Sequence, residues 1–275
     1  MKFFKHLKFD LTYGNFKNSF LIKLIVWVSF VVFACFEVRG ATLRYTDVSF
    51  TVGDYLYYIF SGVREDYLML EFPYMWIVPH ILILFFTLHY ANDDLMGYGQ
   101  QMILRSGKRN LWWLSKCVWN ISNVTIWYLI AWFIITVFSL LNGAVFSLGI
   151  SEKMRGIKEY GTLITVQEVP NWNLWFEITF MPLLTTVALS VLQMGLGMLI
   201  NPAAAYIFSA VVLIASSGTL SIYLFGNYSM AIRSIKLVKN GLSISEGITG
   251  IVILLIIGIV TGLAAIRKYN ILSKE

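Results

Sequence analysis

The sequence predicts an all-α membrane protein with six transmembrane helices, an N-terminal interfacial amphipathic helix and a cytoplasmic coupling helix between spans two and three. Of the 275 residues, 58% are hydrophobic and only 13% are charged, whereas a soluble domain carries about 25% charged residues. The mean hydropathy is +0.71. These values exclude an ordinary soluble domain and a disordered chain, and they indicate a single transmembrane domain over residues 1–275.

Six apolar runs account for the expected spans. A helix needs about 20 residues to cross about 30 Å of hydrocarbon, and each run is near that length. The fourth and fifth runs are separated only by Asn201-Pro202, which predicts a tight helical hairpin. The expected spans are residues 20–36, 73–90, 117–141, 176–200, 203–225 and 248–266.

The distribution of lysine and arginine predicts the orientation of these spans. With a cytoplasmic N-terminus, the inner segments hold twelve basic and four acidic residues, and the outer segments hold nine basic and eleven acidic residues. Cytoplasmic segments of membrane proteins carry the excess of positive charge. We therefore expect a multi-pass protein of a bacterial cell membrane with both termini in the cytoplasm, and no nucleic-acid partner.

Residues 1–19 precede the first span and begin with the amphipathic stretch MKFFKHLKFDL. A short basic amphipathic helix beside a span lies in the headgroup layer, so we expect an interfacial helix. The alternative is a charged flank that only orients the first span. On a helical wheel the apolar residues Phe3, Phe4, Leu7 and Leu11 lie opposite the polar residues Lys2, Lys5, His6, Lys8 and Asp10.

Two long outer loops, 37–72 and 142–175, separate the early spans. The first contains GDYLYYIFSG at 53–62, which is too short to span and is rich in tyrosine, a residue favoured at membrane interfaces. We expect a helix or a re-entrant segment at the outer interface there.

Several catalytic signatures are absent from the sequence. It contains no HExxH, no Cys-x-x-Cys and no Gly-x-Ser-x-Gly, and no carboxylate lies deep in an expected span. His80 and His89 share a span but are nine residues apart, which places them on opposite faces and excludes a shared metal. The sequence therefore disfavours an enzyme and predicts neither a metal nor a cofactor on this chain.

The stretch RSGKRN at 105–110 places a lysine after a glycine, as nucleotide-binding loops do. However, the residue five before Gly107 is Met102 rather than glycine. Arg109 stands where such loops carry the serine or threonine that holds magnesium. If ATP drives this protein, we expect ATP and magnesium to bind a partner polypeptide.

Polar residues of the fourth span form one pattern. Thr186, Ser190 and Gln193, with the glycine one turn later, fall within about 60° of one another on a helical wheel. The favoured interpretation is a seam of helix packing in which Gln193 bonds across the bundle, because small and polar residues join membrane helices generally. The other is a mildly polar wall of a translocation path. In the sixth span, Gly258 and Gly262 form a GxxxG pattern that permits close helix approach.

A polar segment of 25 residues, NDDLMGYGQQMILRSGKRNLWWLSK at 92–116, separates the second and third spans. Its parts are an acidic step, a glycine, an apolar pair, a basic turn and a lead into span three: Asp93-Asp94, Gly97, Ile103-Leu104, 105–109 and 112–116. In this local pattern and in its whole layout, the chain resembles the permease subunits of type-2 ATP-binding-cassette (ABC) exporters. GYGQQ, WWLSK and the long first outer loop depart from the family's simplest members and leave the substrate open.

The resemblance implies a function. Such a subunit lies in the lipid bilayer and forms the translocation path with a second permease chain, the same or a related one, while separate ATP-binding subunits hydrolyse ATP. Family substrates include antimicrobial peptides, drugs and lipids. The residues that would couple to the ATPase are Tyr98, Gln100, Gln101, Arg105, Lys108 and Arg109.

Two alternatives to this interpretation stay open. The segment 92–116 could be a basic connector that only sets orientation, although its length and its glutamines favour coupling. The chain as a whole could be a membrane-embedded sensor or immunity protein that binds a peptide through its outer loops without transport.

Overall fold

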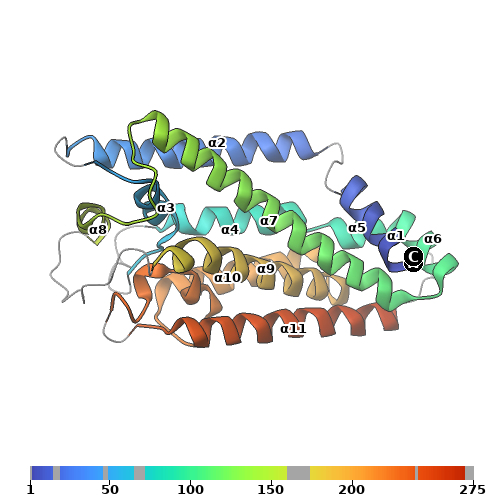
Figure 1. The fold of residues 1–275 in the computed structure, drawn as a ribbon. Coiled ribbons are helices and arrows are strands. Elements are labelled where there is room, and N and C mark those ends of the chain that lie inside the picture. The colour runs from blue at the N-terminus through green and yellow to red at the C-terminus, as the bar shows by residue number, and fades with distance from the viewer. Residues whose placement is uncertain are drawn as a thin grey trace.

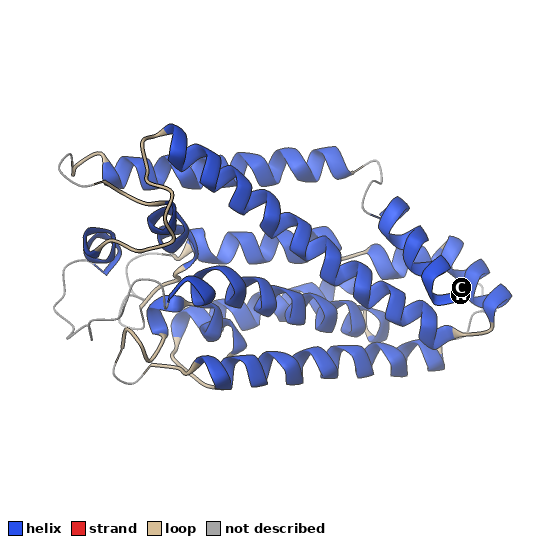
Figure 2. Cartoon of the chain, viewed as in Figure 1, coloured by secondary structure: helices blue, strands red, loops and turns tan. Residues whose placement is uncertain are grey.

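A computed structural model describes residues 2–14, 19–45, 49–64, 72–159, 174–238 and 241–269. Within these ranges the protein consists of helices and loops, and none of the described residues forms a β-strand (Figure 1, Figure 2). The long helices run side by side, with α3 and α8 at one end of the bundle and α1 and α6 at the other (Figure 1). These ends are termed the α3 end and the α6 end.

The helices follow one another along the chain with short connections. The α-helices are α1 (Lys2–Phe9), α2 (Phe20–Thr42), α3 (Val52–Phe60), α4 (Tyr74–Thr87), α5 (Tyr90–Met96), α6 (Tyr98–Ser106), α7 (Arg109–Leu141), α8 (Glu152–Glu159), α9 (Trp175–Leu199), α10 (Pro202–Gly218) and α11 (Ile244–Lys268). A π-helical turn, η1 (Asp10–Gly14), follows α1, and two 3-10 turns, η4 (Phe225–Ser229) and η5 (Ala231–Arg233), lie between α10 and α11.

Five helical segments within the described ranges are long and apolar enough to cross a membrane. They are Phe20–Thr42, Tyr74–Met96, Arg109–Leu141, Trp175–Leu199 and Ile244–Lys268. The chain is therefore an all-helical, multi-pass membrane protein.

The sixth expected crossing rests on α10 and stays a prediction. The helix has 17 residues, which span about 25 Å, somewhat less than the about 30 Å of hydrocarbon. The expected span 203–225 does not continue as one helix, because α10 ends at Gly218 and the chain turns before η4 begins at Phe225.

Two other helices are longer than the apolar runs that predict them. α2 continues to Thr42 rather than to residue 36, and α7 begins at Arg109 rather than at 117. Hydropathy locates the part of a helix that lies in hydrocarbon, whereas backbone hydrogen bonds continue through the polar flanks. The residues that precede the third apolar run therefore belong to the same helix as the span.

α9 is the central helix of the bundle and is buried along most of its length. Its most extensive neighbour is α11. A Cβ on Gly195 would lie 2.7 Å from the carbonyl oxygen of Gly258, and a Cβ on Gly258 would lie 2.7 Å from the backbone nitrogen of Leu192. At Gly262 the space of a side chain is filled by the ring of Trp113. The GxxxG pattern of α11 thus serves packing within the chain.

At the α3 end, one buried carboxylate joins the two long loops. Asp54 forms a capping box with Thr51 at the start of α3, and its other oxygen accepts the backbone N–H of Ser151 at 2.7 Å. Burial is the main influence on Asp54 and raises the pKa of its carboxyl group, while the two loop amides oppose that shift. The helix expected at 53–62 is thus present at 52–60, but its residues are buried against α7 and α9 rather than spread on an interface.

An arginine closes the C-terminal end of α10. Arg233 is buried, and its guanidinium donates to the carbonyls of Ser216 at 2.5 Å and Ser217 at 2.7 Å, in the last turn of that helix. It also donates to the carbonyl of Val63 at 2.8 Å. The last carbonyls of a helix have no partner within the helix, and a basic side chain satisfies them and complements the helix dipole.

The α9–α11 contact provides a direct test of the packing. Gly195→Ala is expected to lower the free energy of unfolding by about 1–3 kcal/mol, because the added methyl group forces two backbones apart. In the matched control, Gly40→Ala, the new Cβ meets no atom within 4 Å, so the melting temperature should stay the same or rise, since alanine favours the helix. Thermal unfolding in detergent measures both, and equal melting temperatures would contradict the packing described.

Candidate functional site

The N-terminal helix docks on the bundle through part of its polar arc. α1 and η1 pack against α7, with His6 5% and Asp10 1% exposed, whereas Phe4 is 72% exposed. Burial lowers the pKa of His6 below its ordinary value, against a smaller opposing influence of Asp10. The helix expected within residues 1–19 is therefore present, and the protein interior takes up polar side chains that the wheel would assign to water.

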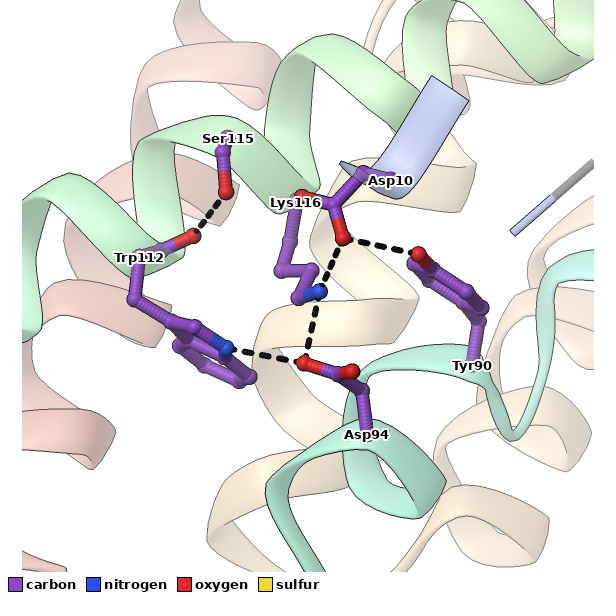
Figure 3. Close-up of polar contacts among 6 residues, drawn as sticks. All are labelled: Asp10, Tyr90, Asp94, Trp112, Ser115 and Lys116. Carbon is purple, nitrogen blue, oxygen red and sulfur yellow. Dashed lines mark hydrogen bonds and ion pairs between the residues drawn. The ribbon is translucent and has the colours of Figure 1, made fainter. Parts of the chain in front are cut away.

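Asp10 is buried because it meets a cation. The Lys116 ammonium group forms ion pairs with Asp10 and, at 2.7 Å, with Oδ2 of Asp94 (Figure 3). The Tyr90 hydroxyl donates to Asp10 at 2.8 Å, and the indole N–H of Trp112 donates to Asp94 at 2.9 Å. These five residues are termed the Lys116 cluster, and they join η1, α5 and α7.

Aromatic rings enclose the ammonium group of Lys116. Its nitrogen lies 4.8 Å from the ring centroid of Tyr90 and 5.2 Å from that of Trp112. Trp119 stacks on the far side of Tyr90, with 3.5 Å between ring centroids. Cation–π attraction is strongest where water is excluded, and Lys116 is only 1% exposed. The rings therefore add to the two ion pairs in replacing the hydration of the ammonium group.

The short helix α6 touches this cluster through a glycine. A Cβ on Gly99 would collide with Oδ2 of Asp94 and would lie 2.7 Å from Nε1 of Trp112. Only glycine lets the first turn of α6 approach the Asp94–Trp112 hydrogen bond this closely. A displacement of α6 must therefore press directly on the buried cluster.

The residues expected to contact an ATPase have different environments. Gln101 and Arg105 lie four residues apart on α6 and are both exposed, so they share one outward face. Lys108 is exposed in the turn after α6, and Gln100 is half-buried. Tyr98 is half-exposed and stacks on Phe9 of α1, with 4.6 Å between ring centroids.

Arg109 is turned away from that face. Its guanidinium donates to the carbonyls of Ile266 at 3.2 Å, Arg267 at 3.0 Å and Tyr269 at 2.9 Å. These carbonyls end α11, so Arg109 caps this helix much as Arg233 caps α10. A change of charge at Arg109 would disturb α11 as well as any partner contact.

The polar residues of the fourth expected span lie in the bundle interior. Thr186, Ser190 and Gln193 are buried on α9, and their side chains hydrogen-bond to α4 and α7. The geometry agrees with the packing interpretation, and the translocation-path interpretation stays a prediction. The bonds join Thr186 to the Tyr128 hydroxyl (2.8 Å), Ser190 to Asn120 (2.8 Å) and to Thr87 (3.0 Å), and Gln193 to the Leu84 carbonyl (3.0 Å).

Sequence reasoning did not identify the Lys116 cluster as a unit. Asp10 was placed only on a polar arc, and Lys116 only among the basic residues that set orientation. The two residues are 106 positions apart, so no local spacing could join them. Within the described ranges, no three or more side chains of His, Cys, Asp and Glu gather as a metal ion would require.

The cluster predicts a non-additive response to mutation. Lys116→Met should lower the free energy of unfolding by about 3–5 kcal/mol, because it leaves two buried carboxylates without a cation. Adding Asp10→Asn and Asp94→Asn to that variant should recover most of the loss, since removing a whole buried ion set is often nearly neutral. Melting temperatures of the single and triple variants measure this. A triple variant that is less stable than Lys116→Met would contradict the cluster.

Comparison with known proteins identifies a family but assigns no activity. Residues 20–272 match the family described as "Protein of unknown function (DUF2705)". No curated protein and no solved structure matches the chain. The match covers all the long helices and the segment that carries α5 and α6. The chain therefore belongs to the DUF2705 family.

Proposed function

We propose that this chain is the membrane-spanning subunit of an ABC exporter, driven by a separate ATP-binding subunit at the α6 end. The observation that carries the proposal is an exposed, basic, short helix fixed on a buried ion cluster at one end of the bundle. A subunit coupled to an external motor needs such a contact, because a force applied outside the membrane must reach the spans.

The contacts of α6 supply a route for that force. Gly99 brings α6 against Asp94 and Trp112, and Lys116 links Asp94 to Asp10. Through these residues α6 is joined to α5, α7 and the N-terminal helix. A rigid, discrete arrangement of this kind can be biased between two states by a partner that binds them unequally.

The exposed charge at the α6 end supports an acidic partner surface on the cytoplasmic side. Exposed basic side chains there include Lys8, Arg105, Lys108, Arg267 and Lys268. Complementary charge steers a partner and fixes its orientation, and positive segments of membrane proteins face the cytoplasm. Both termini would then be cytoplasmic, with the α3 end outside.

The substrate path would lie between this chain and a second permease chain. Thr186, Ser190 and Gln193 are engaged in hydrogen bonds within one chain, so they would line a path only if α4, α7 and α9 separated. The substrate classes that the resemblance implies are antimicrobial peptides, drugs and lipids.

The proposal is tested by reversing charge on α6 without touching α11. Arg105→Glu with Lys108→Glu should reduce co-purification of a stand-alone ABC ATPase from the native host by at least tenfold, because like charges opposed at an interface cost several kcal/mol. Arg109 is left intact because it caps α11. The readout is the amount of ATPase that co-purifies with the tagged chain, normalised to the amount of that chain in the membrane.

The matched control carries the same charge change at the other end. Arg44→Glu with Lys153→Glu alters two exposed residues at the α3 end and should leave the ATPase bound. If both double variants retain the ATPase equally, α6 is only a connector. If no ABC ATPase accompanies the wild-type chain, the sensor or immunity function is favoured instead.

A further inference from the structure

A cavity of about 430 Å³ lies near the α6 end, beside the Lys116 cluster. Its walls come from the start of α2, the junction of α4 and α5, and α7. The stacked rings of Tyr90 and Trp119 line it and separate it from Lys116. It is termed the Lys23 cavity, after the basic residue in its wall.

A cation and an unused hydrogen-bond donor line this cavity. The ammonium group of Lys23 donates to the carbonyl of Phe86 at 2.7 Å, where α4 ends. Trp119 is 2% exposed, and its indole N–H has no acceptor among the described residues. That N–H lies beside Gly14, which lines the same cavity. A buried donor without an acceptor is rare in proteins, so its presence in a cavity points to a ligand with an acceptor oxygen.

The rest of the cavity wall fits an amphiphile. Phe20, Phe85 and Trp127 contribute apolar surface, and Phe85 is 55% exposed on the outside of the bundle. Leu21 and Ile22 of α2 are also exposed beside it, as expected for a lipid-facing helix. The cavity therefore adjoins surface that contacts acyl chains, at the end of a span where headgroups lie.

We infer that the Lys23 cavity binds a phospholipid of the adjoining leaflet, with its phosphate between Lys23 and the Trp119 N–H. Lysine binds phosphate as a point charge, and the indole supplies a directed hydrogen bond. His89 and Asp93 also line the cavity. The Asp93 carboxylate accepts hydrogen bonds but repels a second anion, so it selects a headgroup that carries N–H or O–H donors. Ethanolamine and glycerol headgroups have such donors, whereas choline has none. This inference does not depend on the proposed transport function.

Native mass spectrometry of the full chain, released from detergent, tests the site. The probes are phosphatidylethanolamine, phosphatidylglycerol and phosphatidylcholine with identical acyl chains, each titrated alone. The first two should give a single retained lipid at lower concentration than phosphatidylcholine. Trp119→Phe keeps the ring and removes the N–H, and Lys23→Met removes the charge. Each should weaken retention of the first two lipids about tenfold.

Lys8→Met is the matched control, because Lys8 is an exposed lysine near the same end and does not line the cavity. It should retain lipid as the wild-type chain does. Equal retention of all three lipids, unchanged in Trp119→Phe, would overturn the inference. Displacement of bound lipid by millimolar inorganic phosphate would also overturn it, because the ligand would then be the free anion. Trp119→Phe alone decides the result if Lys23→Met fails to fold.

Discussion

Lys116, buried between two carboxylates, is the interaction on which the α6 end of this protein depends. A lysine removed from water needs a counter-charge and hydrogen-bond partners, since the desolvation penalty otherwise exceeds the attraction. Asp10 and Asp94 supply the charge, and Tyr90 and Trp112 complete the hydrogen bonds. Because these groups come from separate elements, the requirements of one ammonium group fix the N-terminal helix, α5 and α7 relative to one another. Through Gly99, they also fix α6.

A second constraint, the satisfaction of helix ends, explains much of the remaining basic chemistry. Backbone carbonyls that end a helix cannot be left unpaired where water is scarce. Three helices of the described chain end on a basic side chain: α4 on Lys23, α10 on Arg233 and α11 on Arg109. In each case a charge that sequence reasoning assigns to orientation or to a partner also closes a helix. The overlap of roles at Arg109 is why a charge reversal there cannot report on partner binding alone.

The sequence predicts the parts of this structure that depend on local periodicity. Hydropathy identified the long helices, since lipid requires continuous apolar segments of a set length, and it also located the short helices α1 and α3. It did not predict where helices end in polar flanks, as α2 and α7 show, nor that α10 stops at Gly218. The burial of His6, Asp10 and Asp54 was not predictable either, because each is satisfied by residues far away in the chain. Gly99 was visible only as a letter in GYGQQ, since its role depends on a contact between helices.

The account's central claim is that the Lys116 cluster holds the N-terminal helix and α6 to the bundle as one unit. Amide hydrogen exchange of the chain in lipid nanodiscs, compared between wild type and Lys116→Met, tests it most directly, because exchange reports local opening segment by segment. The account predicts faster exchange in residues 2–14 and 98–106 together, with α11 unchanged. Faster exchange in neither segment, or an equal increase in every helix, would contradict it.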